Sequence, residues 1–138
     1  MTVGVIVGTF DMFHVGHLNL CIKAKNNCDI LIAGVNRDHV VLRDKHKAPI
    51  IPENDRLQIL NHIDCVSNAY LVEDNAVQFI CDLIASGQKV DFYFRGNEEK
   101  ESIRIENQQI EAMGCKVVMF PYYQGVSSSE LRLKQQKH

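Results

Sequence analysis

Short apolar runs alternate with longer amphipathic stretches along the 138 residues of this chain. Apolar runs of four to six residues rich in Val and Ile are typical of buried strands, and apolar residues spaced three and four apart are typical of helices with one covered face. The runs predict strands at residues 3–7, 30–35, 69–72, 90–94 and 116–120. The periodic stretches predict helices at residues 18–25, 53–63, 75–86 and 102–113, and a last helix that begins near Ser127. This alternation, with its short connections, predicts an α/β fold: a Rossmann-like, doubly wound sandwich with a five-stranded parallel sheet.

The predicted helices have apolar faces, and one of them has clear end signals. The expected buried residues are Leu18, Cys21 and Ile22 in the first helix, Leu57, Leu60 and Ile63 in the second, and Val77, Ile80, Cys81 and Ile84 in the third. Asn75 is a good N-cap for the third helix, and Gly87 is a good C-terminal stop. Residues 40–52 show no clear period and include Pro49 and Pro52, so we expect a loop that can move.

Composition narrows the class of protein. The length suits one domain, residues 1–138, and the contents of 46% hydrophobic and 23% charged residues are ordinary for a globular protein. The net charge of −2 provides no basic field for nucleic acid. No apolar run approaches the roughly 18 residues of a membrane span and no signal peptide is evident, so we expect a cytoplasmic protein without a membrane partner. The five cysteines form no CxxC pair, which favours free thiols over a disulfide framework or a metal cluster.

The densest chemistry lies between the first strand and the first helix, at residues 8–17. In an open α/β sheet this turn lies at the carboxyl edge, where ligands bind. Gly8 allows a sharp turn and a close approach of a ligand to the backbone. His14 and His17 share one face at the helix start, and the free N–H groups of the first helical turn face the same point. These features predict a phosphate site that contains two imidazoles.

The sequence Gly8-Thr9-Phe10-Asp11, followed by His14-Val15-Gly16-His17, resembles the signature of the HxGH nucleotidylyltransferases. This superfamily includes cytidylyltransferases for glycerol 3-phosphate, choline phosphate and ethanolamine phosphate, and adenylyltransferases for heptose phosphate, pantetheine phosphate and FMN. The resemblance implies nucleotide contacts at Gly8, Thr9, Phe10, Asp11, His14, Gly16 and His17. Two other interpretations of the histidines are ordinary polar residues near a helix start and an i, i+3 metal pair.

A second segment, Gly125-Val126-Ser127-Ser128-Ser129, resembles the triphosphate-binding motif near the carboxyl end of the same superfamily. The resemblance implies nucleotide contacts at Ser127, Ser128, Ser129 and Arg132. A capping box is the alternative, because Glu130 follows Ser127 by three residues, and it is compatible with an anion site. Cytidylyltransferases carry an arginine shortly before the glycine, whereas residues 122–124 here are Tyr-Tyr-Gln. Arg132 and Arg95 are the candidates to replace it.

Two further sets of residues resemble contacts of the superfamily. Arg95-Gly96 ends the fourth predicted strand and matches pantetheine-phosphate adenylyltransferases, which implies a contact with the nucleotide. A solvent-exposed loop arginine is the alternative. Lys45, Lys47 and Arg56 fall where the superfamily binds the acceptor phosphate. A solvated basic surface is the alternative there.

The reaction implied by the resemblance is attack of an acceptor phosphate on the α-phosphorus of a nucleoside triphosphate, with release of pyrophosphate. The second pKa of a phosphate monoester is about 6, so the nucleophile is already ionised and needs no general base. Catalysis then rests on positioning and on stabilisation of charge by His14, His17 and Lys47. Mg²⁺ is the expected cofactor, bridging the phosphates with Asp11 as a weak ligand.

The overall likeness favours a cytidylyltransferase that joins CTP to a phosphorylated polyol such as glycerol 3-phosphate and works as a homodimer. ATP is the alternative nucleotide, because Arg95-Gly96 and residues 127–132 resemble adenylyltransferases of the heptose-phosphate, FMN or pantetheine-phosphate type. A module that binds nucleotide without turnover is the alternative of another class. The base leaves little trace in the sequence, because backbone groups contact it in most members of this fold class.

Overall fold

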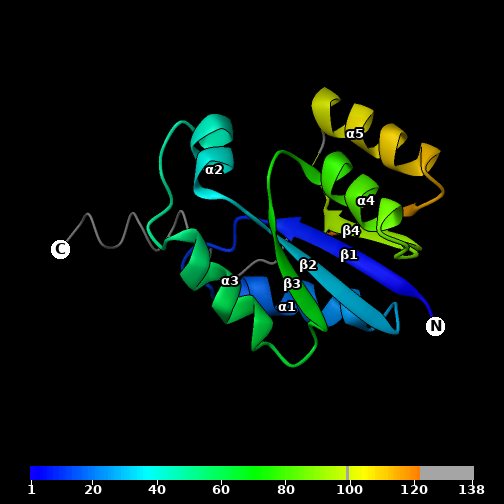
Figure 1. Cartoon of the computed structure of the whole chain (residues 1–138), viewed down its shortest axis with the longest axis horizontal. Coiled ribbons are helices and arrows are strands. Elements are labelled where there is room, and N and C mark those ends of the chain that lie inside the picture. The colour runs from blue at the N-terminus through cyan, green and yellow to red at the C-terminus, as the bar shows by residue number, and fades with distance from the viewer. Residues whose placement is uncertain (99, 122–138) are drawn as a thin grey trace.

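Five parallel strands form the centre of the computed structural model, which describes residues 1–98 and 100–121 (Figure 1). They are β1 (Val3–Gly8), β2 (Ile30–Asn36), β3 (Asn68–Val72), β4 (Phe92–Gly96) and β5 (Lys116–Phe120), in the spatial order β3-β2-β1-β4-β5. The helices of the described part are α1 (Val15–Lys25), α2 (Asp38–Lys45), α3 (Glu53–Asn61), α4 (Ala76–Ala85) and α5 (Glu101–Ala112). The predicted α/β fold with a five-stranded parallel sheet is confirmed.

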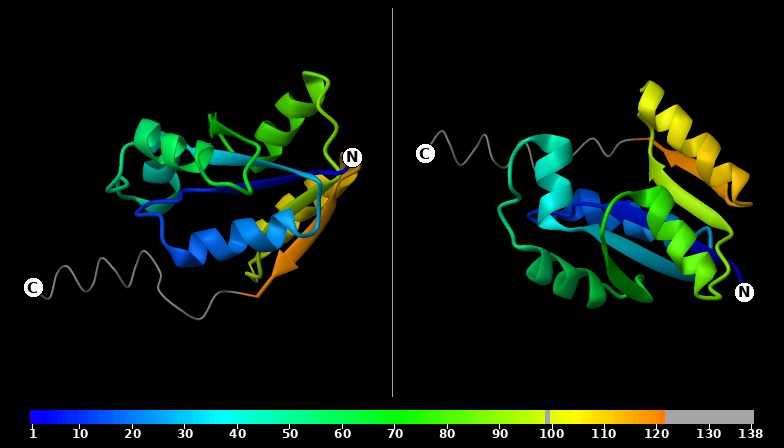
Figure 2. Two further views of the ribbon diagram at one scale, coloured as in Figure 1. Left: turned by 90° about the horizontal axis from the view of Figure 1, so that it is seen from below. Right: turned by 45° about the horizontal axis from the view of Figure 1, so that its top comes forward.

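Helices cover both faces of the sheet, and α1 and α4 lie on opposite sides of it (Figure 2). The cluster on one face includes Cys21 and Ala24 of α1, Leu60 of α3, and Ile6, Leu31 and Phe94 of the strands. The cluster on the other face includes Phe79 and Ile80 of α4, Ile110 of α5, and Val5, Ile32 and Tyr93 of the strands. Burial on both faces explains why β1 and β2 are continuous apolar runs rather than alternating ones.

The direction in which the chain adds strands reverses at β1. From β1 the chain adds β2 and then β3 on one side, and the connection through α4 returns to the other side, where residues 4–6 of β1 pair with β4. Ligands of open α/β sheets bind outside the carboxyl ends of the strands at such a switch point. Those ends are Gly8 of β1 and Gly96 of β4, so residues 8–17 begin at the switch point.

The expectation of a loop over residues 40–52 is wrong for its first part, because α2 occupies Asp38–Lys45. Val40 and Val41 are both buried, and the helix ends at His46, whose φ of 60° is left-handed. An eight-residue helix has only about two turns, too few to give a periodic pattern. The loop proper covers residues 46–52, between α2 and α3.

Two predicted apolar faces are partly wrong. In α4 the buried face consists of Ala76, Phe79 and Ile80, with Leu83 packed beside them, whereas Cys81 and Ile84 are exposed. The sequence is apolar around most of this helix, so two overlapping faces have the same spacing, and the sheet covers the one that contains the large Phe79 ring. In α1 the buried residues are Cys21 and Ala24, while Ile22 is 41% exposed.

The remaining differences are at the ends of elements. The fourth strand begins at Phe92 rather than at Val90, because parallel pairing with β1 starts at Gly4 opposite Phe92. Asn75 caps α4 as expected, since its side-chain oxygen accepts a hydrogen bond from the N–H of Gln78 at 2.8 Å. The last helix expected near Ser127 lies outside the described residues. No helix in the described part of the chain is long and apolar enough to cross a membrane.

Candidate active site

The turn between β1 and α1 has an unusual backbone. Phe10 and Met12 have left-handed φ angles of 54° and 49°, a conformation that costs a residue with a Cβ about 1 kcal/mol or more. The Phe10 ring folds back over Gly8, where an added Cβ would meet the ring at 3.1 Å. Phe10 is also buried in the core on the α1 side of the sheet. The turn is therefore held in its conformation by the packing of Phe10 on a residue that has no side chain.

His14 and His17 form a reciprocal cap at the start of α1. The Nδ1 atom of His14 accepts a hydrogen bond from the N–H of Gly16 at 3.0 Å, and the Nδ1 atom of His17 accepts one from the N–H of His14 at 3.2 Å. A neutral imidazole that accepts on Nδ1 carries its proton on Nε2. The two rings stack with their centroids 4.0 Å apart. Each histidine therefore uses Nδ1 to order the helix start and carries its proton on Nε2.

The protonation state of His17 is set by its surroundings. Burial, followed by the neighbouring charges of His14 and Lys45, lowers the pKa of His17 from 6.5 to about 4, against an opposing influence of Asp11. The ring also contacts Phe10 edge-on and Phe13, with centroid distances of 5.7 and 5.3 Å. His17 is therefore neutral at pH 7, which suits a hydrogen-bond donor to an anion rather than a proton donor.

The two lysines predicted to bind the acceptor flank the end of α2. Lys45 is the last residue of this helix, and its positive charge acts on His17. Lys47 is exposed in the loop of residues 46–52. The structure thus brings the charge of Lys45 within reach of His17, which lies 28 positions earlier in the sequence.

Asp11 and Arg56 are buried, which the sequence did not indicate. Asp11 is 4% exposed, and its carboxylate accepts hydrogen bonds from the N–H groups of Ile50 and Ile51. Arg56 has no exposed surface, and its guanidinium makes four hydrogen bonds within the protein. An arginine has five N–H donors, so four of them are used by the chain itself. These bonds tie the guanidinium to the chain itself, and the predicted contact of Arg56 with an acceptor phosphate stays a prediction.

The described residues do not fit a dedicated Mg²⁺ site. No group of three or more His, Cys, Asp or Glu side chains among them is arranged to hold a metal ion. Both oxygens of the expected ligand, Asp11, accept hydrogen bonds from the 46–52 loop. A role of Mg²⁺ stays a prediction, and no step below depends on its binding by this chain.

Arg95 contacts the helix beside it. Its Nη1 atom donates to Glu106 at 2.7 Å and to Asn107 at 2.9 Å, both in α5, and its guanidinium lies over the Tyr93 ring. These contacts fix α5 against β4 on the face of the sheet that α4 and α5 cover. The predicted contact of Arg95 and Gly96 with a nucleotide stays a prediction.

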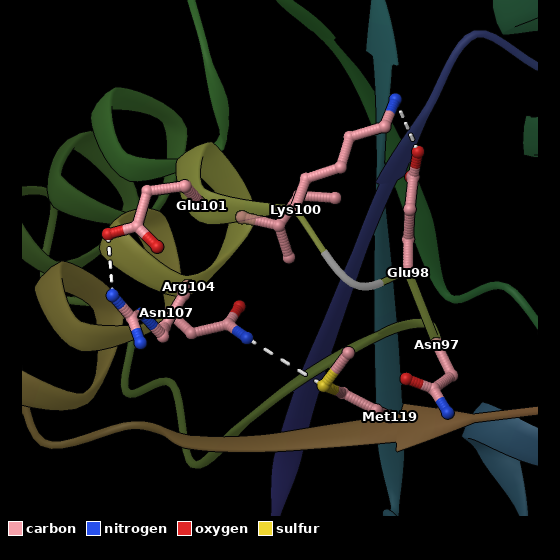
Figure 3. Close-up of a pocket in the computed structure, with 8 residues that line it drawn as sticks. Asn97, Glu98, Lys100, Glu101, Arg104, Asn107 and Met119 are labelled. Carbon is pink, nitrogen blue, oxygen red and sulfur yellow. Dashed lines mark hydrogen bonds and ion pairs between the residues drawn. The ribbon is translucent and has the colours of Figure 1, made fainter.

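A concavity of about 530 Å³ lies where β4 and β5 end, beside the first turns of α5 (Figure 3). Six of its eight lining residues are polar or charged: the lining consists of Asn97, Glu98, Lys100, Glu101, Ile103, Arg104, Asn107 and Met119. The N–H of Asn97 donates to the carbonyl of Phe120 at 2.7 Å, which joins the two strand ends below it. Sequence reasoning identified only the neighbouring Arg95-Gly96, because the lining comes from two segments with no motif. The Ser127, Ser128, Ser129 and Arg132 segment lies outside the described residues.

Two imidazoles at a helix start and a nearby lysine, at the switch point of a parallel sheet, are groups of the kind that bind nucleotide phosphates. Comparison of the whole sequence narrows this class. The cytidylyltransferase-like family model matches residues 5–134, and the chain belongs to this family of nucleotidyltransferases.

Relatives of two kinds match most of the chain. Glycerol-3-phosphate cytidylyltransferase of Bacillus spizizenii is 31% identical over 125 residues, which are 91% of this chain and 90% of that protein. The bifunctional protein HldE of Citrifermentans bemidjiense is 30% identical over 125 residues, or 90% of this chain. The chain spans only 25% of the length of that HldE protein.

Solved structures agree with the fold. The lipopolysaccharide core biosynthesis protein of Thermoplasma volcanium has a TM-score of 0.73 and 27% identity, covering 89% of this chain and 98% of that one. Thermotoga maritima TmcAL, solved with α-thio ATP, has a TM-score of 0.73 over 99% of this chain and 50% of its own. At 14% identity, the likeness to TmcAL shows the fold alone.

Proposed function

We propose that this protein transfers a cytidylyl group from CTP to a phosphorylated polyol such as glycerol 3-phosphate and releases pyrophosphate. The observation that carries the proposal is the His14–His17 pair, whose Nδ1 atoms accept backbone N–H groups so that Nε2 holds the proton. The choice of CTP and of a polyol phosphate is supported by the Bacillus spizizenii relative, which this chain matches over nearly the full length of both proteins.

In the proposed reaction, an oxygen of the acceptor phosphate attacks the α-phosphorus of CTP. A new P–O bond forms, the bond from the α-phosphorus to the bridging oxygen breaks, and pyrophosphate leaves with that electron pair. No proton has to be removed from the nucleophile, because a phosphate monoester is largely dianionic above its second pKa of about 6. The barrier therefore comes mainly from charge repulsion and from alignment of the two reactants.

The protein's part is to offset that charge. The Nε2–H groups of His14 and His17 donate hydrogen bonds to oxygens of the α- and β-phosphates, beside the N–H groups of the α1 start. A neutral His17 performs this without changing protonation state, since its pKa is about 4. Lys45 and Lys47 bring a positive charge for the acceptor phosphate, which arrives at an already anionic site.

Adenylyl transfer from ATP is the second candidate function. It is favoured by the Arg95-Gly96 pair at the end of β4, which resembles adenylyltransferases. A third candidate, a nucleotide-binding module without turnover, has the same site but does not require the lysines. The phosphate chemistry is the same for both nucleotides, so the histidine pair does not discriminate between CTP and ATP.

The test measures pyrophosphate release from CTP, ATP, UTP and GTP with a panel of phosphorylated polyols and sugars, including glycerol 3-phosphate. The proposal expects turnover with CTP and a polyol phosphate. Turnover with ATP and a sugar phosphate would establish the second candidate, and nucleotide binding by calorimetry without pyrophosphate release would establish the third. The His17→Asn variant controls for contaminating activity.

A further inference from the structure

Two charged side chains are buried at the turn between β1 and α1, Asp11 of the turn itself and Arg56 of α3. Asp11 and Arg56 are the buried charged or polar residues of the described part, with exposures of 4% and 0%. A charge is costly to remove from water unless hydrogen bonds and opposite charges compensate it. The hydrogen-bond partners of these two charges therefore identify the segments of the chain that the two side chains join.

The hydrogen bonds of Asp11 and Arg56 meet on one short piece of loop. Asp11 accepts the N–H groups of Ile50 and Ile51, each at 2.8 Å. Arg56 donates from Nε to the carbonyl of Ile51 at 2.8 Å and from Nη1 to the carbonyl of Thr9 at 2.8 Å. We call this set of contacts the Asp11–Arg56 clamp. Ile51 is held at both its N–H and its carbonyl, and residues 9–11 are held by both charged side chains.

The same arginine also holds the start of α2. Its Nη1 atom donates to the carbonyl of Asn36 at 2.7 Å, and its Nη2 atom donates to the Asp38 carboxylate at 2.7 Å. Arg43 of α2 is further paired with Asp74 after β3. The 46–52 loop is therefore fastened at its far end to the active-site turn, and the helix before it is fastened to the sheet.

This anchoring bears on Lys47. The chain spans at most about 3.5 Å per residue, so Lys47 cannot lie more than about 11 Å from Ile50 along the backbone. With the N–H groups of Ile50 and Ile51 fixed to Asp11, three positions before His14, the volume open to Lys47 is limited to this reach. Released from Asp11, the loop would carry Lys47 through a much larger volume, and its charge would contribute less where it is needed.

We propose that Asp11 and Arg56 are positioning residues, which fix the lysine-bearing loop relative to the His14–His17 pair without contacting nucleotide, metal or acceptor. This inference rests on the proposed function, because it takes Lys47 to act on the acceptor phosphate. It replaces two roles expected from the sequence, Asp11 as a Mg²⁺ ligand and Arg56 as a phosphate ligand.

The central experiment is Asp11→Asn, which keeps one accepting oxygen but turns an NH₂ group toward a backbone N–H. We expect kcat/KM for the acceptor to fall at least about 10-fold, while the Kd of nucleotide alone, measured by calorimetry, stays within about threefold. The loss should be the same from 1 to 20 mM Mg²⁺, concentrations chosen on the order of physiological to saturating levels for a weak oxygen site. Arg56→Lys removes the planar fork of donors. It should likewise lower kcat/KM for the acceptor while leaving the Kd of the nucleotide nearly unchanged.

Two comparisons separate positioning from a general loss of fold. Asp55→Asn, at an exposed carboxylate next to Arg56 on α3, should leave all of these values unchanged. Adding Lys47→Ala to Asp11→Asn should cost less than Lys47→Ala costs in the unmodified protein, because residues that act through one element are not additive.

A measurement on the unmodified, ligand-free protein keeps the proposal testable even where variants do not fold. The amide hydrogens of Ile50 and Ile51 should exchange at least about 10-fold more slowly than expected for an open loop, since a buried carboxylate accepts both. Three results would each overturn the proposal: rapid exchange of these amides, recovery of the activity of Asp11→Asn by added Mg²⁺, or a collapse of nucleotide affinity in Asp11→Asn. Absence of pyrophosphate release by the unmodified protein would instead overturn the proposed function and leave the exchange result intact.

Discussion

At the scale of single residues, His14 and His17 each have a structural task in the helix cap and, in the proposed reaction, a chemical one. The spacing of His14 and His17 predicted that they share one face of the helix start, and their centroid distance of 4.0 Å agrees with this. The structure adds which nitrogen does what: Nδ1 accepts a backbone N–H of the cap, and Nε2 carries the proton. The two tasks can therefore be separated by substitutions that imitate one nitrogen at a time.

We expect His17→Ala to lower kcat by at least about 100-fold while the protein still folds, because a charge contact of the transition state is lost. His17→Asn should be equally inactive but more stable than His17→Ala, because its amide oxygen can take the place of Nδ1 as acceptor for the N–H of His14. His17→Gln, whose amide reaches toward the Nε2 position, should keep more activity than His17→Asn. Steady-state kinetics and thermal unfolding test this order, and near-normal turnover of folded His17→Asn would contradict the assignment.

The pKa of His17 also predicts how stability changes with pH. An unfolded histidine has a pKa near 6.5, and that of folded His17 is about 4. Between these values the unfolded chain binds a proton that the folded protein does not, so the free energy of unfolding falls as the pH is lowered from 6.5 to 4. Below pH 4 the titration of His17 no longer changes the free energy of unfolding. The full shift would correspond to about 3 kcal/mol, and partial exposure of the ring reduces our expectation to about 1 to 2 kcal/mol.

Urea unfolding of the unmodified protein and of His17→Asn at pH 7, 5.5 and 4 measures this contribution. Other groups titrate in both proteins, so the difference between the two isolates His17. The gap in unfolding free energy between the proteins should narrow or reverse as the pH falls through this window. A gap that is constant from pH 7 to 4 would show that His17 is not buried as described.

The residues that sequence reasoning could not place are the buried ones with distant partners. Arg56 stands in the polar stretch Glu53–Arg56 at the start of α3, which is typical of a solvated helix end. Its acceptors are carbonyls of Thr9, Asn36 and Ile51, and a carbonyl is the same at every position whatever the side chain. A single sequence therefore predicted a role for Arg56 at the candidate site but not the burial of its side chain.

At the scale of elements, prediction succeeded where an element is long or bounded by strong signals. The strands β1, β2 and β5 and the capped helix α4 were located within one or two residues. Prediction failed at α2, because eight residues are too few for a period and because the prolines at 49 and 52 are typical of a loop. The 46–52 loop is also less free than its composition suggests, since Asp11 holds two of its N–H groups.

The position of this loop leads to a prediction for Lys47. Repulsion between phosphates is greatest for the acceptor, which arrives second, so the lysine should act on the acceptor more than on the nucleotide. Lys47→Ala should raise the acceptor KM or lower kcat, and it should leave nucleotide affinity within about threefold, a change of less than about 1 kcal/mol.

Calorimetric titration of Lys47→Ala with nucleotide alone is the decisive measurement. Lys89→Ala is a matched control, because Lys89 is an exposed lysine between α4 and β4, at the opposite end of the strands from residues 8–17. A collapse of nucleotide affinity in Lys47→Ala, with none in the control, would assign the loop to the triphosphate site instead.

At the scale of the whole molecule, the order of strands determines where the site can form. Alternating elements and right-handed connections predicted a parallel sheet, but they did not specify that the fourth strand returns to the free side of β1. The position of β4 depends on side-chain contacts between strands that are distant in the sequence. One such contact is that of the Phe94 ring of β4 with Gly4 of β1. The return of the chain to β1 creates the switch point, and it brings the histidine turn at the end of β1 beside the end of β4.

The surface of the whole molecule leads to the last prediction, a two-fold symmetric dimer. Both ends of the sheet are edge strands, β3 and β5, which have a partner strand on one side only within the described chain. Large apolar side chains are exposed beside these edges, including Tyr70 on β3 at 46% and Met119 on β5 at 37%. Proteins tend to cover such edges, and a two-fold axis allows one patch to cover its own copy, which makes C₂ dimers the commonest oligomers.

Sedimentation equilibrium between about 1 and 50 μM, a range on the order of typical dimer dissociation constants, should give twice the mass of the 15.7 kDa chain. Tyr70→Lys and Met119→Lys place a charge at one edge or the other, and the variant that dissociates identifies the edge at the interface. His62→Lys, on the exposed end of α3, controls for the added charge alone. A monomer at every concentration of the unmodified protein would refute the dimer and would leave a site built within one chain.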